Sequence, residues 1–359
     1  MASTYKLGEF IEKLNRPNDE LQYGIDDVCG ITNTKELMLG TRANLNGRTF
    51  EKFTILEPRE FIFNRRTSRN GEKISLGYNT TERAWILTED YCHFRVKPEA
   101  EAQLDPDYLY LCFLNPEFDR YVRFNSWGSA TEFFNWDDMV RVPISLPSLP
   151  EQKKRVASYR SVSKRIEEMN RFVQYLERLG STLYRNTVEA NCPNTKLRDA
   201  LVIKEKSKIQ VGEADTHGTY PFFTSGKTVL RDSHVLTDGE SLFINTGGSF
   251  DVKYYRGQAS YSTDVLAVQS KTRLAAYLYL FLKDNQGVIS ERYFQGSALK
   301  HLQRDEFLDM EVYIPSQEND LRVEQIRAIF DEISICNRQI RYLEKLKSIL
   351  IAQAQREVK

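Results

Sequence analysis

The chain has 359 residues, with 50 basic and 50 acidic side chains and no formal net charge. This length allows two or three domains that each bury a core, and the charge balance argues against a uniformly basic protein that coats DNA, although local basic loops remain possible. The 19 Tyr and 20 Phe residues favour ordered sheets and recognition surfaces over disorder.

The predicted elements form two mixed regions of helix and strand, each followed by one long helix. Short β-branched and aromatic runs bounded by Gly, Asp and Ser predict the strands. Asp105 followed by Pro106 has the order of a helix cap and a first helical residue. In chain order we expect a helix at 105–114, a strand at 142–146, a long helix at 150–189, strands at 241–244, 252–255 and 265–268, a helix at 274–283, a strand at 310–314 and a long helix at about 320–356.

Both long helices carry apolar side chains on a seven-residue grid, which is typical of a coiled coil. We expect a capping box formed by Ser148 and Glu151 to begin the first helix, and forty helical residues would span roughly 60 Å. A shift of 167 residues places one grid on the other, and only Gly180 and Lys347 interrupt it. The residues predicted to pair are Ile166, Val173, Leu176 and Leu183 in the first helix and Ile333, Ile340, Leu343 and Leu350 in the second.

The same shift reveals an internal repeat. Residues 170–183 and 337–350 are identical at eight of fourteen positions, at the constant offset of 167. Related blocks such as 108–111 and 277–280 extend the repeat upstream. The offset grows to 190 at the front of each copy, so insertions lie between the shared blocks, where loops tolerate them. One heptad run alone predicts homodimerisation, whereas two copies in one chain favour an antiparallel helix pair about a pseudo-twofold axis.

We therefore predict an α+β chain with two mixed α/β domains. The first domain is expected at 1–148, the central long helix at 149–190, the second domain at 191–316 and the C-terminal long helix at 317–359.

The cysteines and histidines indicate neither a metal site nor a disulfide framework. The five cysteines form no Cys-x-x-Cys pair and the four histidines are scattered, so a zinc site is improbable and a reducing compartment is favoured. The first residues lack the apolar core of a signal peptide, and the longest apolar run is about half the length that crosses a bilayer. We predict a soluble cytoplasmic protein.

Several strings imitate catalytic motifs without their essential residues. Residues 105–108 and 115–118 resemble the D/N-P-P-Y/F loop of amino-methyltransferases, but the third position is acidic in both, which favours helix capping. Residues 226–228 resemble the end of a P-loop, yet the glycine needed five positions before Gly226 is Pro221. No Ser/His/Asp or Cys/His set can be identified, so we predict no catalytic residue and no metal site.

Loops that carry cations, amides and hydroxyls are the candidate binding elements. Residues 64–73 crowd four cations into a turn-like loop, and residues 245–253 occupy the equivalent place in the second copy with two glycines. Arg and Asn can bridge base edges, and Ser or Thr can serve bases or phosphate. The Gly-Ser-Ala segments at 128–130 and 296–298 would expose backbone N–H groups that suit phosphate. The alternatives are a solvated hairpin for each loop and a tight turn for each Gly-Ser-Ala segment.

The order of these segments resembles the specificity subunits of type I restriction–modification systems. The resemblance covers essentially the whole chain and rests on the domain–helix–domain–helix order, the Gly-Ser-Ala segments, the proline-rich segment before Glu151 and Gln152, and the repeated Asn-Arg-x-x-x-Tyr-Leu-Glu. Residues 220–226 with 261–264 look like a target-recognition domain of that family, and 67–71 with 124–130 look like another branch of such domains. Residues 317–320 depart from the Pro-Glu-Gln pattern, which weakens only the expected start of the second long helix.

The resemblance implies a non-catalytic protein in which each target-recognition domain reads one half of a split, asymmetric DNA site. The helix pair would fix the unread spacer, and half-sites about one turn, roughly 34 Å, apart would present the same DNA face. The expected partners are double-stranded DNA, two methyltransferase subunits with S-adenosylmethionine, and restriction/translocase subunits with ATP and Mg; this chain would hold no cofactor. The predicted DNA-binding residues are Arg65, Arg66, Ser68, Arg69, Asn70, Lys73, Trp127, Ser129, Thr131, Thr224, Ser225, Lys227, Asn245, Thr246, Ser249, Lys253, Ser297 and Lys300.

Two other classes of function remain as alternatives. A stand-alone DNA-modifying enzyme, either a nuclease or a methyltransferase, would need a cofactor loop or a set of metal-binding carboxylates. A structural coiled-coil adaptor would have no affinity for DNA in the presence of a methyltransferase.

Overall fold

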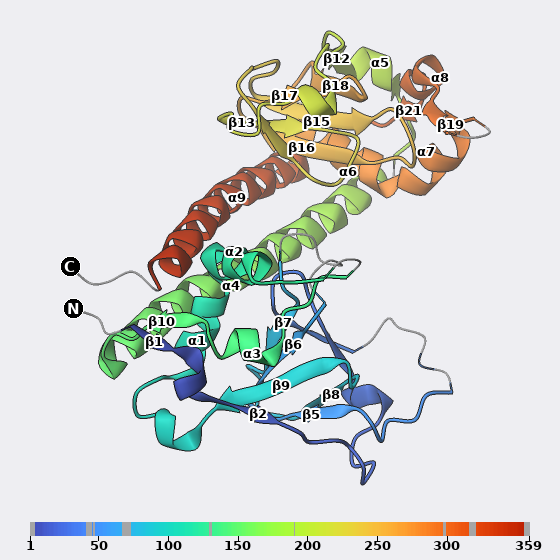
Figure 1. The fold of residues 1–359 in the computed structure, drawn as a ribbon. Coiled ribbons are helices and arrows are strands. Elements are labelled where there is room, and N and C mark those ends of the chain that lie inside the picture. Colours follow the sequence, from blue (N-terminus) through green and yellow to red (C-terminus); the bar gives the residue numbers. More distant parts are fainter. Residues whose placement is uncertain are drawn as a thin grey trace. The chain divides into compact units, whose positions relative to one another are not determined.

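The computed structural model divides into two compact units (Figure 1). It describes residues 4–40, 45, 47–66, 73–128, 131–189, 191–296, 299–315 and 321–354. The first unit comprises residues 1–166 and 342–359, and the second comprises residues 167–341. The chain therefore passes from one unit to the other inside its two long helices.

The first unit is built on a four-stranded antiparallel sheet with the strand order β2-β9-β6-β7. Three two-stranded ladders accompany it, namely β1-β10, β3-β4 and β5-β8. The elements are β1 (Thr4–Lys6), β2 (Ile11–Leu14), β3 (Cys29–Ile31), β4 (Leu37–Leu39), β5 (Thr54–Leu56), β6 (Phe61–Asn64), β7 (Leu76–Tyr78), β8 (Trp85–Leu87), β9 (Tyr91–Val96), α1 (Pro106–Phe113), α2 (Pro116–Phe124), α3 (Trp136–Met139) and β10 (Pro143–Ser145).

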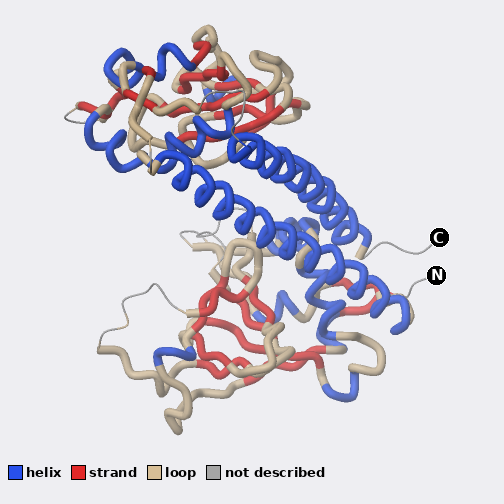
Figure 2. The backbone as a smooth tube through the Cα atoms, turned by 180° about the vertical axis from the view of Figure 1, so that it is seen from behind, coloured by secondary structure: helices blue, strands red, loops and turns tan. Residues whose placement is uncertain are grey.

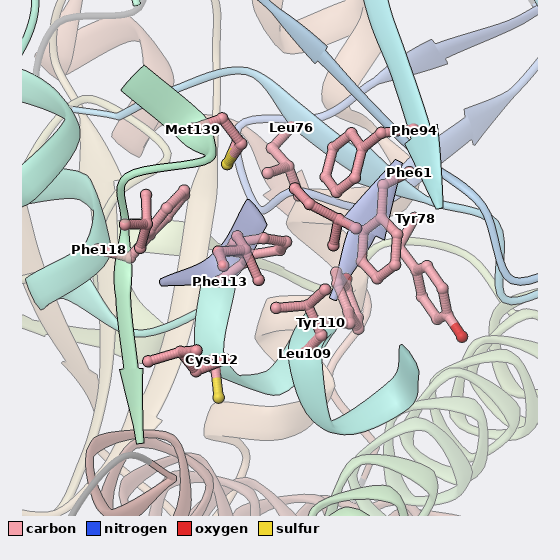
Figure 3. Packing of buried hydrophobic residues seen from close by; sticks show 14 of the residues in the cluster. Phe61, Leu76, Tyr78, Phe94, Leu109, Tyr110, Cys112, Phe113, Phe118 and Met139 are labelled. Atoms are coloured by element: carbon pink, nitrogen blue, oxygen red, sulfur yellow. The ribbon is translucent and has the colours of Figure 1, made fainter. Parts of the chain in front are cut away.

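Aromatic side chains fill the core of the first unit, as Figure 3 shows. Phe61 on the central strand β6 lies opposite Phe94 of β9 and Tyr78 of β7. Its ring stacks on both, with centroid distances of 5.0 and 4.4 Å, and meets Phe113 of α1 edge-on at 5.6 Å. Such cross-strand aromatic pairs stabilise a sheet, and here they also attach helix α1 to one face of it.

The second unit repeats this arrangement. Its main sheet has the order β12-β18-β15-β16 and is again antiparallel. The elements are β11 (Thr195–Lys196), α5 (Leu197–Ala200), β12 (Leu201–Ile203), β13 (Tyr220–Phe223), β14 (Leu230–Asp232), β15 (Glu240–Asn245), β16 (Val252–Arg256), β17 (Ser260–Tyr261), β18 (Val265–Ser270), α6 (Ala275–Asp284), α7 (Gln286–Arg292), β19 (Phe294–Gln295), β20 (His301–Leu302), α8 (Arg304–Leu308) and β21 (Glu311–Val312).

The two sheets match strand for strand in chain order. In both units the first sheet strand is an edge, the last pairs with the first, and the two middle strands follow as a hairpin. The ladder β11-β21 likewise corresponds to β1-β10. The internal repeat of the sequence is therefore a repeat of topology, and the predicted fold class is confirmed.

Local capping explains the strings that imitate a methyltransferase loop. The Asp105 side chain accepts from the Asp107 N–H at 2.8 Å, and Pro106 is the first residue of α1. The Asn115 side chain accepts from the Glu117 N–H at 3.0 Å in front of α2. Each cap satisfies one of the free N–H groups at a helix start, which confirms the capping interpretation.

The two long helices are α4 (Leu149–Val188) and α9 (Leu321–Gln353), and Figure 2 shows them side by side. Within the first unit, Arg155 near the start of α4 donates to the carbonyl oxygens of Gln353 and Ala354 at 3.1 and 2.7 Å. Within the second unit, Arg322 near the start of α9 donates to the carbonyl oxygen of Asn186 at 2.8 Å. The start of each helix lies beside the end of the other, so the helices are antiparallel.

The predicted pairing residues lie on the inner side of the helix pair to different degrees. Val173, Leu176, Ile333 and Ile340 are buried, and Ile166, Leu183, Leu343 and Leu350 are partly buried. Gly180 is buried because Phe330 and Ile329 of α9 pack against its backbone. Phe330 also meets the rings of Tyr254 and Tyr279 at 5.1 and 5.5 Å, so the same contact attaches α9 to the second unit.

None of the helices in the described part of the chain combines the length and the apolar character that a bilayer crossing requires.

We predict that Gly180→Leu lowers the free energy of unfolding. A Cβ at this position would lie 3.3 Å from Cε2 of Phe330, and the remaining leucine atoms would overpack the contact, which costs about 1–3 kcal/mol. Chemical denaturation provides the measurement. Gly287→Ala in α7 is the control, because its Cβ would meet open space and should cause no loss. Equal stability of the leucine variant and the parent chain would contradict the close approach of α9 to Gly180.

Candidate functional site

In the second unit, the structure brings three predicted binding segments together, at 224–228, 245–251 and 299–302. The Gly248 N–H donates to the Lys300 carbonyl at 2.9 Å, and the Leu302 N–H donates to the Thr246 carbonyl at 3.0 Å. An antiparallel bridge also joins Gly247 to His301. The loop at 245–251 thus forms an extra backbone ladder with the segment that follows the second Gly-Ser-Ala.

The glycine that opens each Gly-Ser-Ala segment is required by the backbone. Gly128 has φ +152° and Gly296 has φ +144°, and both lie in the region that side chains avoid. A Cβ would also collide with the carbonyl oxygen of Thr131 in the first unit and of Leu299 in the second. A glycine in a positive-φ conformation, closely approached by backbone, therefore precedes the last strand in both units. Ser129 and Ser297 lie outside the described residues.

Asn245 shapes the loop at 245–251 from inside. Its side chain is buried; the amide donates to the carbonyl of Gly247 at 3.0 Å and to that of Ser249. Its oxygen accepts from the Asp251 N–H at 2.6 Å. One amide therefore satisfies three backbone groups of the loop, as a hydrogen-bond network with every member paired should.

Three charged side chains connect this loop to its neighbours. The Asp251 carboxylate lies 2.9 Å from Nζ of Lys283 on α6 and 3.2 Å from Nζ of Lys253 on β16. Lys253 Nζ also donates to the carbonyl of Thr224 at 3.1 Å. Burial alone would raise the pKa of Asp251, but the two ammonium groups hold that pKa below its usual value. The pair Asp251–Lys253 thus joins the loops at 224–228 and 245–251.

Other predicted residues of this cluster face outward. Thr224 is buried, and its hydroxyl accepts from the Gly226 N–H at 3.2 Å, which shapes the turn. Lys227, Ser249 and Lys300 are exposed, whereas Ser225 and Thr246 are partly exposed. The outer surface therefore offers ammonium groups, hydroxyls and glycine backbone. These are groups that can contact phosphates or base edges.

In the first unit Phe133 and Phe134, which were not predicted, connect two predicted segments. The Phe134 N–H donates to the Arg65 carbonyl at 2.8 Å, and antiparallel bridges join Phe133 to Arg66 and to Trp127. Arg65, Arg66 and Lys73 are exposed, and Thr131 is partly exposed. Ser68, Arg69 and Asn70 lie outside the described residues. The arginines and Trp127 are therefore neighbours through the backbone of one short strand-like segment.

Two large aromatic side chains of the first unit are highly exposed. Trp127 is 73% exposed, and Phe124 at the end of α2 is 82% exposed. Sequence reasoning selected Trp127 but missed Phe124, because an aromatic residue at the end of an amphipathic helix normally belongs to the core. Aromatic side chains that project beside arginines can stack on bases or enter a base step.

A buried ion pair bonds to the backbone of Ile74, directly after the loop at 64–73. Lys35 and Asp119 lie 2.8 Å apart and are both buried. Lys35 donates to the Phe113 carbonyl at 2.6 Å, and Asp119 accepts from the Ile74 N–H at 3.1 Å. Burial lowers the pKa of Lys35 below its usual value, although the Asp119 carboxylate offsets part of that effect. Sequence reasoning had no signal for this pair, whose members are 84 positions apart.

The catalytic alternatives find no support in the described residues. Residues 226–228 run from β13 directly into the antiparallel partner β14, whereas a P-loop leads into a helix. Among the described residues, no group of three or more His, Cys, Asp or Glu side chains is placed to hold a metal ion. His93 on β9 and Glu60 just before β6 lie 2.8 Å apart, and both are buried.

A family model and a curated relative that match parts of this chain both concern type I restriction specificity proteins. Residues 193–345 match the model of the type I restriction modification DNA specificity domain. The chain is 24% identical over 151 residues to the specificity subunit of the type I restriction enzyme EcoDI from Escherichia coli. The aligned region covers 42% of this chain and 33% of that protein. The chain thus spans about a third of the length of this curated relative.

Two solved structures are similar to this chain. The S subunit of a type I restriction–modification system from M. genitalium matches 100% of this chain and 97% of its own, with a TM-score of 0.64 at 12% sequence identity. The HsdS subunit from Thermoanaerobacter tengcongensis matches 99% of this chain and 96% of its own, with a TM-score of 0.40 at 14% identity. The first of these is similar to this chain in fold.

Proposed function

We propose that this chain is a specificity subunit of a type I restriction–modification system and that its two units read the two halves of a split DNA site. The match of residues 193–345 to the DNA specificity domain supports this assignment. Specificity subunits are non-catalytic DNA-recognition components, so the reactions themselves fall to other subunits. The chain would select the sequence, and it would need no cofactor of its own.

One observation carries this proposal. The unit that matches the DNA specificity domain and the unit before it share one sheet order, yet their loops differ. The first unit presents arginines and projecting aromatic rings, and the second presents lysines, serines and glycine backbone. A shared scaffold with different loop chemistry is what two readers of different sequences require.

The exposed members of the two loop clusters are the proposed DNA contacts. In the first unit these are Arg65, Arg66, Lys73, Trp127 and Phe124, and in the second they are Ser225, Lys227, Ser249 and Lys300. The chain has no net charge, which is compatible with this role if partner subunits supply much of the phosphate contact.

The paired helices would fix the spacer and dock the partner subunits. Each carries exposed apolar residues away from the seam, and these repeat at the offset of 167: Tyr175 and Leu179 on α4, and Tyr342 and Leu346 on α9. Two equal patches suit two copies of one partner, which we propose to be methyltransferase subunits that bind S-adenosylmethionine. Restriction/translocase subunits that use ATP and Mg would complete the complex in the cytoplasm.

Methylation mapping tests this function. The chain would be co-expressed with its methyltransferase subunit, and modified bases would be located throughout the host genome. We expect one two-part motif with a gap of constant length. A continuous motif, or no modification when both proteins are present and soluble, would contradict the proposal.

Alanine at Arg65, Arg66 and Arg69 should damage one half-site and leave the other intact. Each lost bidentate contact to a base should cost about 1–3 kcal/mol of discrimination, measured as relative methylation of single-base variants of the site. Ser249→Ala is the reciprocal control, because its effect should be confined to the other half-site. A uniform loss across all sequences with a reduced salt dependence would assign the arginines to phosphate instead.

A further inference from the structure

Lys253 is unlike the other lysines of the second loop cluster. Its ammonium group is held between the Thr224 carbonyl at 3.1 Å and the Asp251 carboxylate at 3.2 Å, and its side chain is only 15% exposed. Lys227 and Lys300 are exposed at the surface of the same cluster. These bonds use two of the three ammonium donors and hold the group against the protein. Extending the side chain outward to DNA would break them and leave a partly buried carboxylate with one partner fewer.

The position of Lys253 in the sheet shows how its two bonds hold the loop at 224–228. It lies directly opposite Phe243 in the β15–β16 ladder, and Phe243 stacks on Phe223 with a centroid distance of 4.1 Å. Phe223 precedes Thr224, so the stacked rings and the ammonium bond hold the same end of the loop at 224–228. Asp251, fixed by Asn245 through its N–H, provides the matching support for the loop at 245–251.

We propose that Lys253 and Asp251 are positioning residues for the second half-site: together they fix the loops at 224–228 and 245–251 relative to each other, and neither contacts DNA. This inference rests on the proposed function and refines it. The bases would be read by groups on the outer surface, such as Ser225 and Ser249, whereas the exposed Lys227 would contact a phosphate. Loss of the Lys253–Asp251 pair would let the two loops shift, so that discrimination would fall at several base positions at once.

The test uses the complete complex of this chain with its methyltransferase subunits. The probe is a duplex that carries the two-part sequence found by methylation mapping, together with its single-base variants in each half. Binding is measured as a function of salt concentration. The variants are Lys253→Met, which keeps the length of the side chain, Asp251→Asn, which keeps its shape, and Lys253→Arg as the conservative replacement.

For Lys253→Met and Asp251→Asn we expect discrimination within the second half-site to fall about tenfold, within the range for a base contact that is lost. The salt dependence should not change, because no phosphate contact disappears. Discrimination in the first half-site should remain intact, which also reports that the complex has assembled. Lys253→Arg should restore part of the lost discrimination.

Two control variants separate positioning from contact. Lys227→Met makes the same chemical change at an exposed lysine, and as a phosphate contact it should lower the slope of log K against log salt by about 0.9 with discrimination intact. Asp309→Asn removes a paired surface carboxylate, 2.5 Å from Arg198, on a different part of the second unit, and should change neither quantity.

The proposal is overturned if Lys253→Met lowers the salt slope as Lys227→Met does while discrimination stays intact, since Lys253 would then contact DNA. It is equally overturned if Lys253→Met and Asp251→Asn both behave like the parent complex. A parent complex that recognises no two-part site would refute the proposed function, and that result is visible before any variant is measured.

Discussion

The antiparallel contact between α4 and α9 is the constraint on which the rest of the molecule depends. The chain leaves each unit only inside these two helices, so each unit contains one stretch of both. In the second unit Phe330 of α9 packs against the α4 backbone at Gly180 and against two tyrosines of the globular part. In the first unit Tyr108 of α1 donates to the Ala354 carbonyl just beyond the end of α9. The helices are therefore part of the core of each unit and not a separate connector.

Each unit contains two groups of charged side chains, namely exposed cations on the loops and ion pairs that bond to the backbone. Exposed arginines and lysines at the loop surfaces are available for a polyanion. The pairs Lys35–Asp119 and Lys253–Asp251 instead bond to the backbone at the base of a loop. These two ion pairs do not occupy equivalent positions in the internal repeat. Under this proposal, different residues position the loops of the two copies, while the order of the main sheet is the same.

Much of the fold could be predicted because its signals are local or repeated. The seven-residue grid gave the long helices, Asp105 and Asn115 gave the caps, and the 167-residue offset gave the antiparallel pairing within one chain. The short strands of the first unit were not predicted, since three-residue segments such as β3 and β5 are too brief to show a period. Phe330 was missed because the grid selected its neighbour Ile329, and Gly180 was taken for an interruption of the seam although Phe330 packs against it.

The candidate site was predicted less completely, for a physical reason. Composition shows which side chains can contact DNA, but an ammonium group is available only if nothing inside the protein uses it. The partners of Lys253 include Thr224, which is 29 positions away, and no sequence pattern connects them. Burial of Asn245 and exposure of Phe124 are likewise set by packing between distant segments.

The central claim is that the paired helices set the distance between two independent readers. The most direct measurement is methylation mapping of a chain with one heptad inserted between residues 166 and 167 and another between residues 341 and 342. Seven residues preserve the apolar seam and lengthen the pair by about 10 Å. The account predicts a longer unread spacer between two unchanged half-sites. An unchanged spacer, from a complex that still methylates DNA, would contradict it.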